Sequence, residues 1–447
     1  MPRPLLIENG TVVSTGGKPF VASKCSVLIE DGLITRVAPK ARFARFKGKR
    51  IDASGKVVMP GLINAHTHFY STFSRGLTGT KPAGDFLGVL RNLWWRLDRA
   101  LTLEDCYYGA LVALLDCIRH GTTTVIDHHA SPCAVSGSLA SIARAVRETG
   151  LRACLCYEVS DRDGARVAEE GLAENAEFIE ECRQQNDSCM KALFGLHASF
   201  TLSDRTLEWA AMLGQESDAG FHIHLAEAQS DQDITVRRSG KRVVERLKRF
   251  GLLGRRSIAA HGVHLSRREI DLLAETQTAV VHNPQSNLNN AVGIANIVEL
   301  KRRGVRLGLG TDAMTTNLLE ELRVGLWAQH LGNDNPSAGF GELTNALFSG
   351  NADIAARCFG LPFGELREGA AGDIALFEYD PPTPLDDTNL FGHVVFGISQ
   401  AAADTTIVGG RVLMENKQLA LNLDEERLNR RARELARNLW KRMQSER

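Results

Sequence analysis

The middle of the chain alternates short apolar runs with longer segments of helical periodicity. The apolar runs begin at eight positions, namely Val57, Thr122, Arg152, Lys191, Gly220, Ser257, Ala279 and Val305. Between them, stretches such as 104–120 and 138–150 carry apolar residues at helical spacing. Eight alternating strand and helix units favour a closed barrel over an open sheet. We therefore expect an α/β fold with a catalytic (β/α)8 TIM barrel over residues 57–371.

Both ends of the chain are strand-like instead. Asn9-Gly10 and Asp31-Gly32 lie between apolar runs near the N-terminus, and Gly409-Gly410 does the same near the C-terminus. Such dipeptides are typical of hairpin turns. We predict one small β domain, a β-sandwich, that both chain ends form together from residues 1–56 and 372–420.

The last stretch, residues 421–447, has a different pattern. Leu428, Leu435 and Leu439 recur at helical spacing, with charged residues between them. This arrangement predicts a C-terminal helix whose apolar side packs on the body of the protein.

Polar residues gather at the C-terminal ends of the apolar runs, where a barrel keeps its active site. They are His66, His68, Asp127, His128, His129, Glu158, His197, His224, Glu227, His261, His282 and Asp312. His66 and His68 are two residues apart, so in a strand both side chains point to the same side. A metal site uses two such imidazoles, whereas a buried strand has little need of them. Whether 127–129 line the pocket or tie neighbouring loops together stays open.

Three further strand ends offer metal- or proton-handling groups. Glu227 follows His224 by three residues, which pairs an imidazole ligand with a carboxylate able to move protons. His261 ends the sixth run and Asp312 ends the eighth. Taken singly, each has an ordinary alternative, such as a hydrogen-bonded buried histidine or a helix N-cap. Their joint occurrence at the ends of four runs favours a metal-dependent active site.

Several motifs, in this order along the chain, resemble those of a known superfamily. They are PGLINAHTH, HIHLAE, AHGVHLS, HNPQSNLNN and LGLGTDA. Together they resemble the amidohydrolase superfamily in its metal-dependent deaminase and chlorohydrolase branch, and the resemblance covers essentially the whole chain. FYSTFSRGL, NLWWRLDRAL and TVIDHHASP are more narrowly similar to the SsnA-type aminohydrolases, which occur with purine and selenium-related metabolism.

The resemblance implies a role for each matched residue. The implied metal ligands are His66, His68, His224 and Asp312. Glu227 matches the acid that passes protons to the substrate, while His261, with Asp312, matches the residues that orient or deprotonate the attacking water. Two-metal relatives carry a bridging Lys at the end of strand four, but here that run ends in His197 and has Lys191 only at its start. We therefore expect one divalent metal, zinc in the first place and iron as the alternative.

The expected reaction is hydrolytic deamination of an aminated N-heterocycle of the purine, pyrimidine or pterin type. The metal would lower the pKa of a bound water, and Glu227 would protonate a ring nitrogen so that hydroxide attacks the adjacent carbon and ammonia leaves. Hydrolytic ring opening of a cyclic amide and dechlorination of a triazine-like ring are alternatives. An inactive barrel that serves as a scaffold is a third, disfavoured because every ligand position is filled.

Loop residues suggest how the substrate binds. By resemblance, His197 touches the substrate. Arg75 can bind an oxygen or an anionic group, Trp94 and Trp95 can stack on a flat ring, and Asn283 can hydrogen-bond a ring edge. The alternatives are a solvated arginine, helix packing by the tryptophans, and loop capping by the asparagine.

The composition of the chain limits the kinds of binding partner that we expect. The 447 residues include 53 basic and 53 acidic side chains, and this balance argues against a nucleic-acid or anionic-membrane partner. We expect neither a secretory leader nor a membrane span, because the sequence lacks the apolar segments that both need. Nine cysteines without a CxxC pair favour the reducing cytoplasm. The expected partners are a small heterocyclic substrate and a second copy of the chain in a homodimer.

Overall fold

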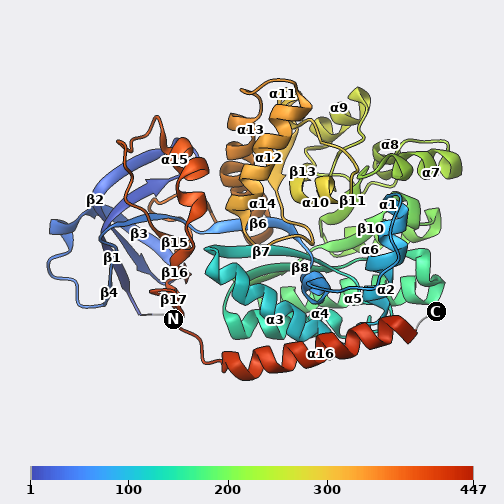
Figure 1. The fold of residues 1–447 in the computed structure, drawn as a ribbon, viewed down its shortest axis with the longest axis horizontal. Coiled ribbons are helices and arrows are strands. Elements are labelled where there is room, and N and C mark those ends of the chain that lie inside the picture. The colour runs from blue at the N-terminus through green and yellow to red at the C-terminus, as the bar shows by residue number, and fades with distance from the viewer. Residues whose placement is uncertain (1–2, 446–447) are drawn as a thin grey trace.

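The strands in the middle of the chain form two parallel sheets in the computed structural model, which describes residues 3–445 (Figure 1). One sheet has the order β6-β7-β8-β9 and the other β10-β11-β12-β13-β14. The strands are β6 (Leu62–Thr67), β7 (Thr122–His129), β8 (Arg152–Tyr157), β9 (Met190–Ala192), β10 (Phe194–Ala198), β11 (Phe221–Leu225), β12 (Ile258–His261), β13 (Ala279–His282) and β14 (Arg306–Leu309). Each predicted apolar run contains at least one of them, and helices follow most of the strands, as α/β units require.

The two sheets meet at both of their edges. Isolated parallel bridges join Thr67 to Asp312 and Val159 to Leu196. The backbone N–H of Thr311 also donates to the carbonyl oxygen of His66 at 2.9 Å. The C-terminal end of β6 therefore lies beside the segment that follows β14. All strand ends that carry the polar residues open toward one region of the molecule.

The first predicted strand differs from the structure. The run that begins at Val57 is two strands, β5 (Lys56–Pro60) and β6, separated by Gly61. β5 pairs with strands from the two chain ends rather than with the parallel sheets. A Cβ atom at Gly61 would lie 2.2 Å from the side chain of Thr123, so only glycine allows this close passage. Continuous hydrophobicity does not reveal where a chain moves from one sheet to another, which explains the error.

Both chain ends contribute to a single nine-stranded sheet beside the parallel sheets (Figure 1). Its order is β18-β17-β16-β15-β5-β1-β2-β3, with β4 paired to β1. The strands are β1 (Leu5–Ser14), β2 (Phe20–Glu30), β3 (Leu33–Pro39), β4 (Lys49–Asp52), β5, β15 (Ile374–Glu378), β16 (Ala403–Val408), β17 (Arg411–Glu415) and β18 (Gln418–Leu419). The two ends are joined by the antiparallel pairing of β5 with β15 and by an isolated antiparallel bridge between Leu33 and Ala371. The predicted sandwich arrangement stays a prediction.

Helices follow or cover the strands. They are α1 (Phe86–Val89), α2 (Trp95–Arg99), α3 (Leu103–Arg119), α4 (Ser138–Thr149), α5 (Ala165–Gln185), α6 (Asp204–Glu216), α7 (Gln229–Ser239), α8 (Val243–Arg249), α9 (Arg267–Thr276), α10 (Pro284–Asn289), α11 (Ile297–Arg302), α12 (Leu318–Gly332), α13 (Phe340–Asn345), α14 (Asn351–Phe359), α15 (Leu390–Phe396) and α16 (Glu425–Ser445). A capping box of Thr102 and Asp105 starts α3, because each side chain accepts from the other residue's backbone N–H. The segments with helical spacing at 104–120 and 138–150 correspond to α3 and α4.

The C-terminal helix α16 runs along α2 and α3 (Figure 1). Leu428, Leu435 and Leu439 are buried, as their helical spacing predicts. Trp440 donates from Nε1 to the carbonyl oxygen of Phe73 at 2.7 Å, which ties the helix to the segment after β6. Throughout residues 3–445, every helix is too short or too polar to span a bilayer.

Removal of residues 1–50 should yield insoluble protein. The deletion takes away β1, β2 and β3, so β5 would lose its partner β1 and expose an unpaired strand edge that associates with other chains. Expression of the truncated and full-length chains in parallel, followed by a sedimentation assay, measures this outcome. A soluble truncation that melts cooperatively would show that the C-terminal strands do not need the N-terminal ones.

Candidate active site

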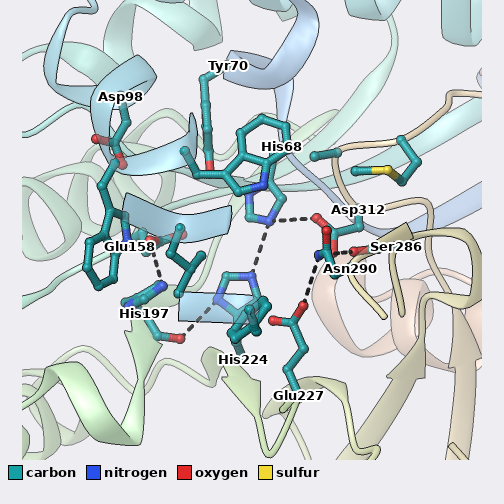
Figure 2. A pocket seen from close by; sticks show the side chains of 16 residues that line it. His68, Tyr70, Asp98, Glu158, His197, His224, Glu227, Ser286, Asn290 and Asp312 are labelled. Carbon is teal, nitrogen blue, oxygen red and sulfur yellow. Dashed lines mark hydrogen bonds and ion pairs between the residues drawn. The ribbon is translucent and has the colours of Figure 1, made fainter. Parts of the chain in front are cut away.

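Three histidines from two strands lie together at the C-terminal ends of the parallel strands. His66 and His68 end β6, and His224 lies on β11, with all three side chains buried. Nε2 of His68 lies 3.1 Å from Nε2 of His224 (Figure 2). The ring centroids of His66 and His224 are 5.1 Å apart. The predicted histidine ligands from these two strands therefore occupy one small volume.

Hydrogen bonds to the backbone fix the protonation of two of these rings. Nδ1 of His68 donates to the carbonyl oxygen of His128 at 2.5 Å, and Nδ1 of His224 donates to that of His197 at 3.0 Å. With the proton on Nδ1, each neutral ring presents a lone pair at Nε2. Two lone pairs 3.1 Å apart repel each other unless a cation or an added proton lies between them.

His66 and Asp312 complete the donor set. Nδ1 of His66 contacts Nε2 of His222 at 2.9 Å, while its own Nε2 is buried and has no hydrogen-bond partner in the described part of the chain. Oδ1 of Asp312 lies 3.2 Å from Nε2 of His68. Ligand atoms of His66, His68 and Asp312 lie within 4.8 Å of one another. Three imidazoles and a carboxylate are a donor set that suits a divalent metal, so the residues fit one.

Burial and charge set the pKa values of these groups in opposite directions. Burial lowers the pKa of His66 and His224 well below the ordinary value, which keeps both rings neutral and able to act as ligands. Burial also acts to lower the pKa of His68, but the adjacent Asp312 carboxylate outweighs it and raises the value to about 9. Without a cation, His68 therefore holds the added proton that relieves the repulsion between the Nε2 atoms of His68 and His224. The pair that His68 forms with Asp312 lowers the pKa of Asp312 despite its burial. Asp312 is therefore an anion at neutral pH.

A second group of side chains lies next to the ligand set. Nε2 of His261 is 3.5 Å from Oε2 of Glu227 and 3.4 Å from Oδ2 of Asp312. Nδ1 of His261 donates a hydrogen bond to Oδ1 of Asn287 at 2.8 Å. The ring proton therefore lies on Nδ1, which leaves Nε2 free to act as a base. Burial raises the pKa of Glu227 to about 7, and Asp312 adds to the effect. A carboxyl with such a pKa can both give and take a proton near neutrality.

The backbone at three of these strand ends adopts a left-handed conformation. Ala226, His261 and Asp312 have φ angles of 47°, 78° and 51°. Non-glycine residues rarely adopt positive φ, and such residues cluster where a structure positions functional side chains. At each of these residues the backbone turns abruptly and leaves the strand direction. The turn keeps the functional side chains at the C-terminal ends of the strands.

A small cavity of about 40 Å³ opens beside the ligand set (Figure 2). His68, His224, Glu227 and Asp312 line one part of it. The residues that line the rest include Tyr70, Trp94, Trp95, Asp98, Glu158, His197, Ser286 and Asn290. The structure thus brings the predicted substrate residues Trp94 and His197 to the cavity.

Two predicted substrate residues lie elsewhere. The Arg75 side chain is 55% exposed, pairs with Asp116 of α3 at 2.7 Å and is not part of the cavity lining, which favours the solvated alternative. Asn283 is fully buried and donates to the carbonyl oxygen of Val281 at 3.3 Å, outside the cavity lining. Ser286 and Asn290, one and two turns along the helix that follows Asn283, face the cavity in its place.

Two cavity residues have roles that the sequence did not reveal. Asp98 is buried and forms an ion pair with Arg162, while its Oδ1 has no hydrogen-bond partner among residues 3–445. Burial raises the pKa of Asp98 to about 6 against the opposing effect of Arg162. Glu158 lies 3.2 Å from Nδ1 of His128 and 3.5 Å from Nε2 of His197. Glu158 was visible at a strand end, but in the sequence Asp98 looks like one charge among several on a helix.

Residues 127–129 tie neighbouring segments together. Oδ1 of Asp127 accepts from the backbone N–H of Phe69 at 2.7 Å and so holds the chain just after His68. His128 supplies the carbonyl oxygen that orients His68. Nε2 of His129 contacts Oγ of Ser131 at 2.9 Å. In the described structure, none of the three lines the cavity, which favours the loop-tying alternative.

A sequence model described as the amidohydrolase family matches residues 57–413, most of the chain. The chain belongs to the amidohydrolase family. The narrower resemblance to SsnA-type aminohydrolases stays a prediction.

Named relatives of this amidohydrolase include deaminases. It is 33% identical over 446 residues to a 5-methylthioadenosine/S-adenosylhomocysteine deaminase of Desulforudis audaxviator, with 97% of this chain and 99% of the relative covered. It is 33% identical over 436 residues to a 5'-deoxyadenosine deaminase of Methanobrevibacter smithii, with 96% of each chain covered. A zinc-bound adenosine deaminase from Xanthomonas campestris superposes with a TM-score of 0.87 at 25% identity, with 99% of this chain and 98% of that one covered.

Replacement of Arg162 by Met should destabilise the protein by about 3–5 kcal/mol, the usual cost of leaving a buried charge without its partner. The side chains of Arg162 and Asp98 are only 7% and 2% exposed. Arg75→Met is the matched control, because it breaks an exposed Arg–Asp pair whose loss costs about 0–1 kcal/mol. Urea unfolding measures the loss of unfolding free energy in each variant. Equal losses would show that the buried pair contributes no more to stability than the exposed pair.

Proposed function

We propose that this amidohydrolase removes an amino group from an aminated N-heterocycle by hydrolysis and releases ammonia, with an adenine nucleoside as the substrate class. The observation that carries the proposal is the position of Glu227, whose pKa of about 7 makes it a proton donor beside His261 and Asp312. The related deaminases named above support the substrate class.

The same residues suggest how a metal takes part. His66, His68, His224 and Asp312 would hold one divalent metal, zinc or alternatively iron. When bound, such a metal lowers the pKa of a water toward neutrality and so makes a nucleophile available. The lone pairs of His68 and His224, 3.1 Å apart, and the buried unpartnered Nε2 of His66 support this assignment.

Proton transfer falls to two residues. His261, with Nε2 free, takes the proton that the attacking water gives up, and Asp312 stabilises the imidazolium from 3.4 Å. Glu227 gives its proton to a ring nitrogen, which makes the adjacent amino-bearing carbon open to attack. His261 then gives its proton to the amino group, which leaves as ammonia, while the proton of the new hydroxyl group on the ring carbon passes to Glu227 and restores the acid.

The other residues of the cavity suit a nucleoside. Trp94 and Tyr70, whose ring centroids are 6.3 Å apart, provide flat apolar surface for a heterocycle. Oδ1 of Asp98, buried and unpartnered within residues 3–445, can accept a hydrogen bond from a sugar hydroxyl. In Figure 2, Asp98 and Glu227 lie on opposite sides of the cavity, which separates the sugar end from the reacting end. His197 lies on the same side as Asp98 and adds a second polar contact.

Architecture and partners form part of the same proposal. We infer that the two parallel sheets close into a (β/α)8 barrel over residues 57–371 and that residues 1–56 and 372–420 form a β-sandwich domain. A cytoplasmic location is supported by the scattered cysteines, and the zero net charge disfavours nucleic-acid and membrane partners. Exposed Trp327, Leu331 and Phe396, on contacting helices α12 and α15, support a homodimer.

A substrate panel tests the function. Adenosine, 5'-deoxyadenosine, 5-methylthioadenosine, S-adenosylhomocysteine and guanine are incubated with metal-loaded protein, beside a cyclic amide and a chlorotriazine. Ammonia release with a matching change in purine absorbance is expected for at least one adenine nucleoside. Ring opening without ammonia, or chloride release alone, would assign the reaction to another branch of the family.

His66→Ala should lose the metal while the protein stays folded. His66 supplies a ligand at the barrel mouth rather than a large apolar side chain in the core, so its loss removes an unpartnered nitrogen. Elemental analysis and circular dichroism of the variant measure both properties, with Arg75→Ala as the control that keeps its metal. Two metals per wild-type chain, or none after metal-supplemented expression, would contradict the single-metal assignment.

Glu227→Gln should keep the metal and bind substrate, yet turn over at least about 10²-fold more slowly, because Gln cannot transfer a proton. The side chain is nearly isosteric, and Asn290 remains available to hydrogen-bond it. Metal occupancy and kcat are measured on the same preparation. Near wild-type turnover would refute the proton-transfer role, and loss of metal together with activity would instead make Glu227 a ligand.

A further inference from the structure

The turn that connects His224 with Glu227 is held from two sides. Ala226, in its centre, has a φ of 47°, a conformation that costs an alanine roughly 1–2 kcal/mol. Its carbonyl oxygen accepts from the backbone N–H of His264 at 2.9 Å. Its own N–H donates to Oδ2 of Asp231 at 2.8 Å. A strained turn persists only where such contacts determine its geometry.

Of the two contacts that hold Ala226, the one with Asp231 is made by a side chain and the one with His264 by the backbone. Asp231 lies in the first turn of α7, is 1% exposed, and does not line the cavity. Thr235, one helical turn further on, contacts its Oδ1 at 3.5 Å and also donates to Ser199 at 3.1 Å. Packing and hydrogen bonds thus hold the Asp231 carboxylate in place. A side chain can fix the position of a neighbouring group only if its own position is fixed in this way.

We propose that Asp231 is a positioning residue for the reaction, because it fixes the left-handed turn at Ala226 and thereby aims Glu227 at His261 and Asp312. This inference rests on the proposed role of Glu227. Among residues 3–445, a 3.4 Å hydrogen bond from Asn290 and a 3.5 Å contact with His261 are what hold the Glu227 carboxylate. The backbone that carries Glu227 therefore has to supply much of its orientation.

Two substitutions separate the hydrogen bond from the branched shape of the side chain. Asp231→Asn keeps both the volume and an oxygen that can accept from Ala226, whereas Asp231→Leu keeps a branch at Cγ but removes the acceptor. Displacing a catalytic group by about 1 Å can cost on the order of 10²-fold in rate. We expect Asp231→Leu to lower kcat at least ~10-fold with metal content and KM little changed, and Asp231→Asn to retain most of kcat.

A matched control removes a comparable carboxylate elsewhere. Glu174 of α5 is also buried and accepts from the backbone N–H groups of Gly137 and Leu139, both at 2.9 Å. It is not part of the cavity lining. Glu174→Met should lower the melting temperature and leave kcat unchanged. If Asp231→Leu fails to fold, Asp231→Ala replaces it, since it removes the same acceptor without adding branched volume.

The decisive measurement combines kinetics with hydrogen exchange. In the Glu227→Gln background, Asp231→Leu should cause no further loss of kcat, because both changes disable the same group. The amide of Ala226 should exchange faster in Asp231→Leu but not in Asp231→Asn. Unchanged exchange, or a kcat loss that adds fully to that of Glu227→Gln, would overturn the proposal. Absence of ammonia release from the wild type would refute the proposed function. Hydrogen exchange needs no substrate, so the exchange measurement would still decide whether Asp231 holds the turn.

Discussion

Two hydrogen bonds from histidine rings to backbone carbonyl oxygens determine the chemistry of this site. His68 and His224 each donate from Nδ1 to the end of a neighbouring strand, which leaves their Nε2 lone pairs facing one another at 3.1 Å. The carbonyl groups belong to the strand ends at His128 and His197, so the arrangement of the parallel strands itself sets the tautomer of these two rings. Had the rings carried their protons on Nε2, the same residues would form an ordinary polar cluster.

The sequence predicts that His66, His68, His224 and Asp312 lie together, and it does so for a physical reason. Ligand-type residues sit at strand ends, and both the strands and their ends follow from local hydrophobic pattern. What depends on distant partners was not predictable. Arg75 forms an ion pair with Asp116 of α3. Asp98 forms a buried ion pair with Arg162, which lies 64 residues further along the chain. The division of the first run into β5 and β6 depends on contact between Gly61 and Thr123, which no local pattern reveals.

In the proposed reaction, the acid Glu227 decides which group leaves, and the metal ligands do not. Hydrolysis of a carbon–nitrogen, carbon–chlorine or ring amide bond can use the same nucleophile, but loss of ammonia requires a proton donor at the substrate ring. Glu227 meets that requirement because burial and the neighbouring Asp312 keep its pKa near neutrality. An inactive scaffold would have no need of a buried carboxyl with that property, nor of three buried histidines directed into one volume.

The central claim is that three imidazoles and one carboxylate share a single metal. X-ray absorption spectroscopy at the zinc edge of the metal-loaded protein tests it most directly. The account predicts nitrogen and oxygen scatterers at about 2.0–2.2 Å, with the multiple-scattering pattern of imidazole rings. A metal–metal distance of roughly 3.5–4 Å would instead reveal a two-metal centre, and sulfur scatterers at about 2.3 Å would place the metal on cysteine, away from these residues.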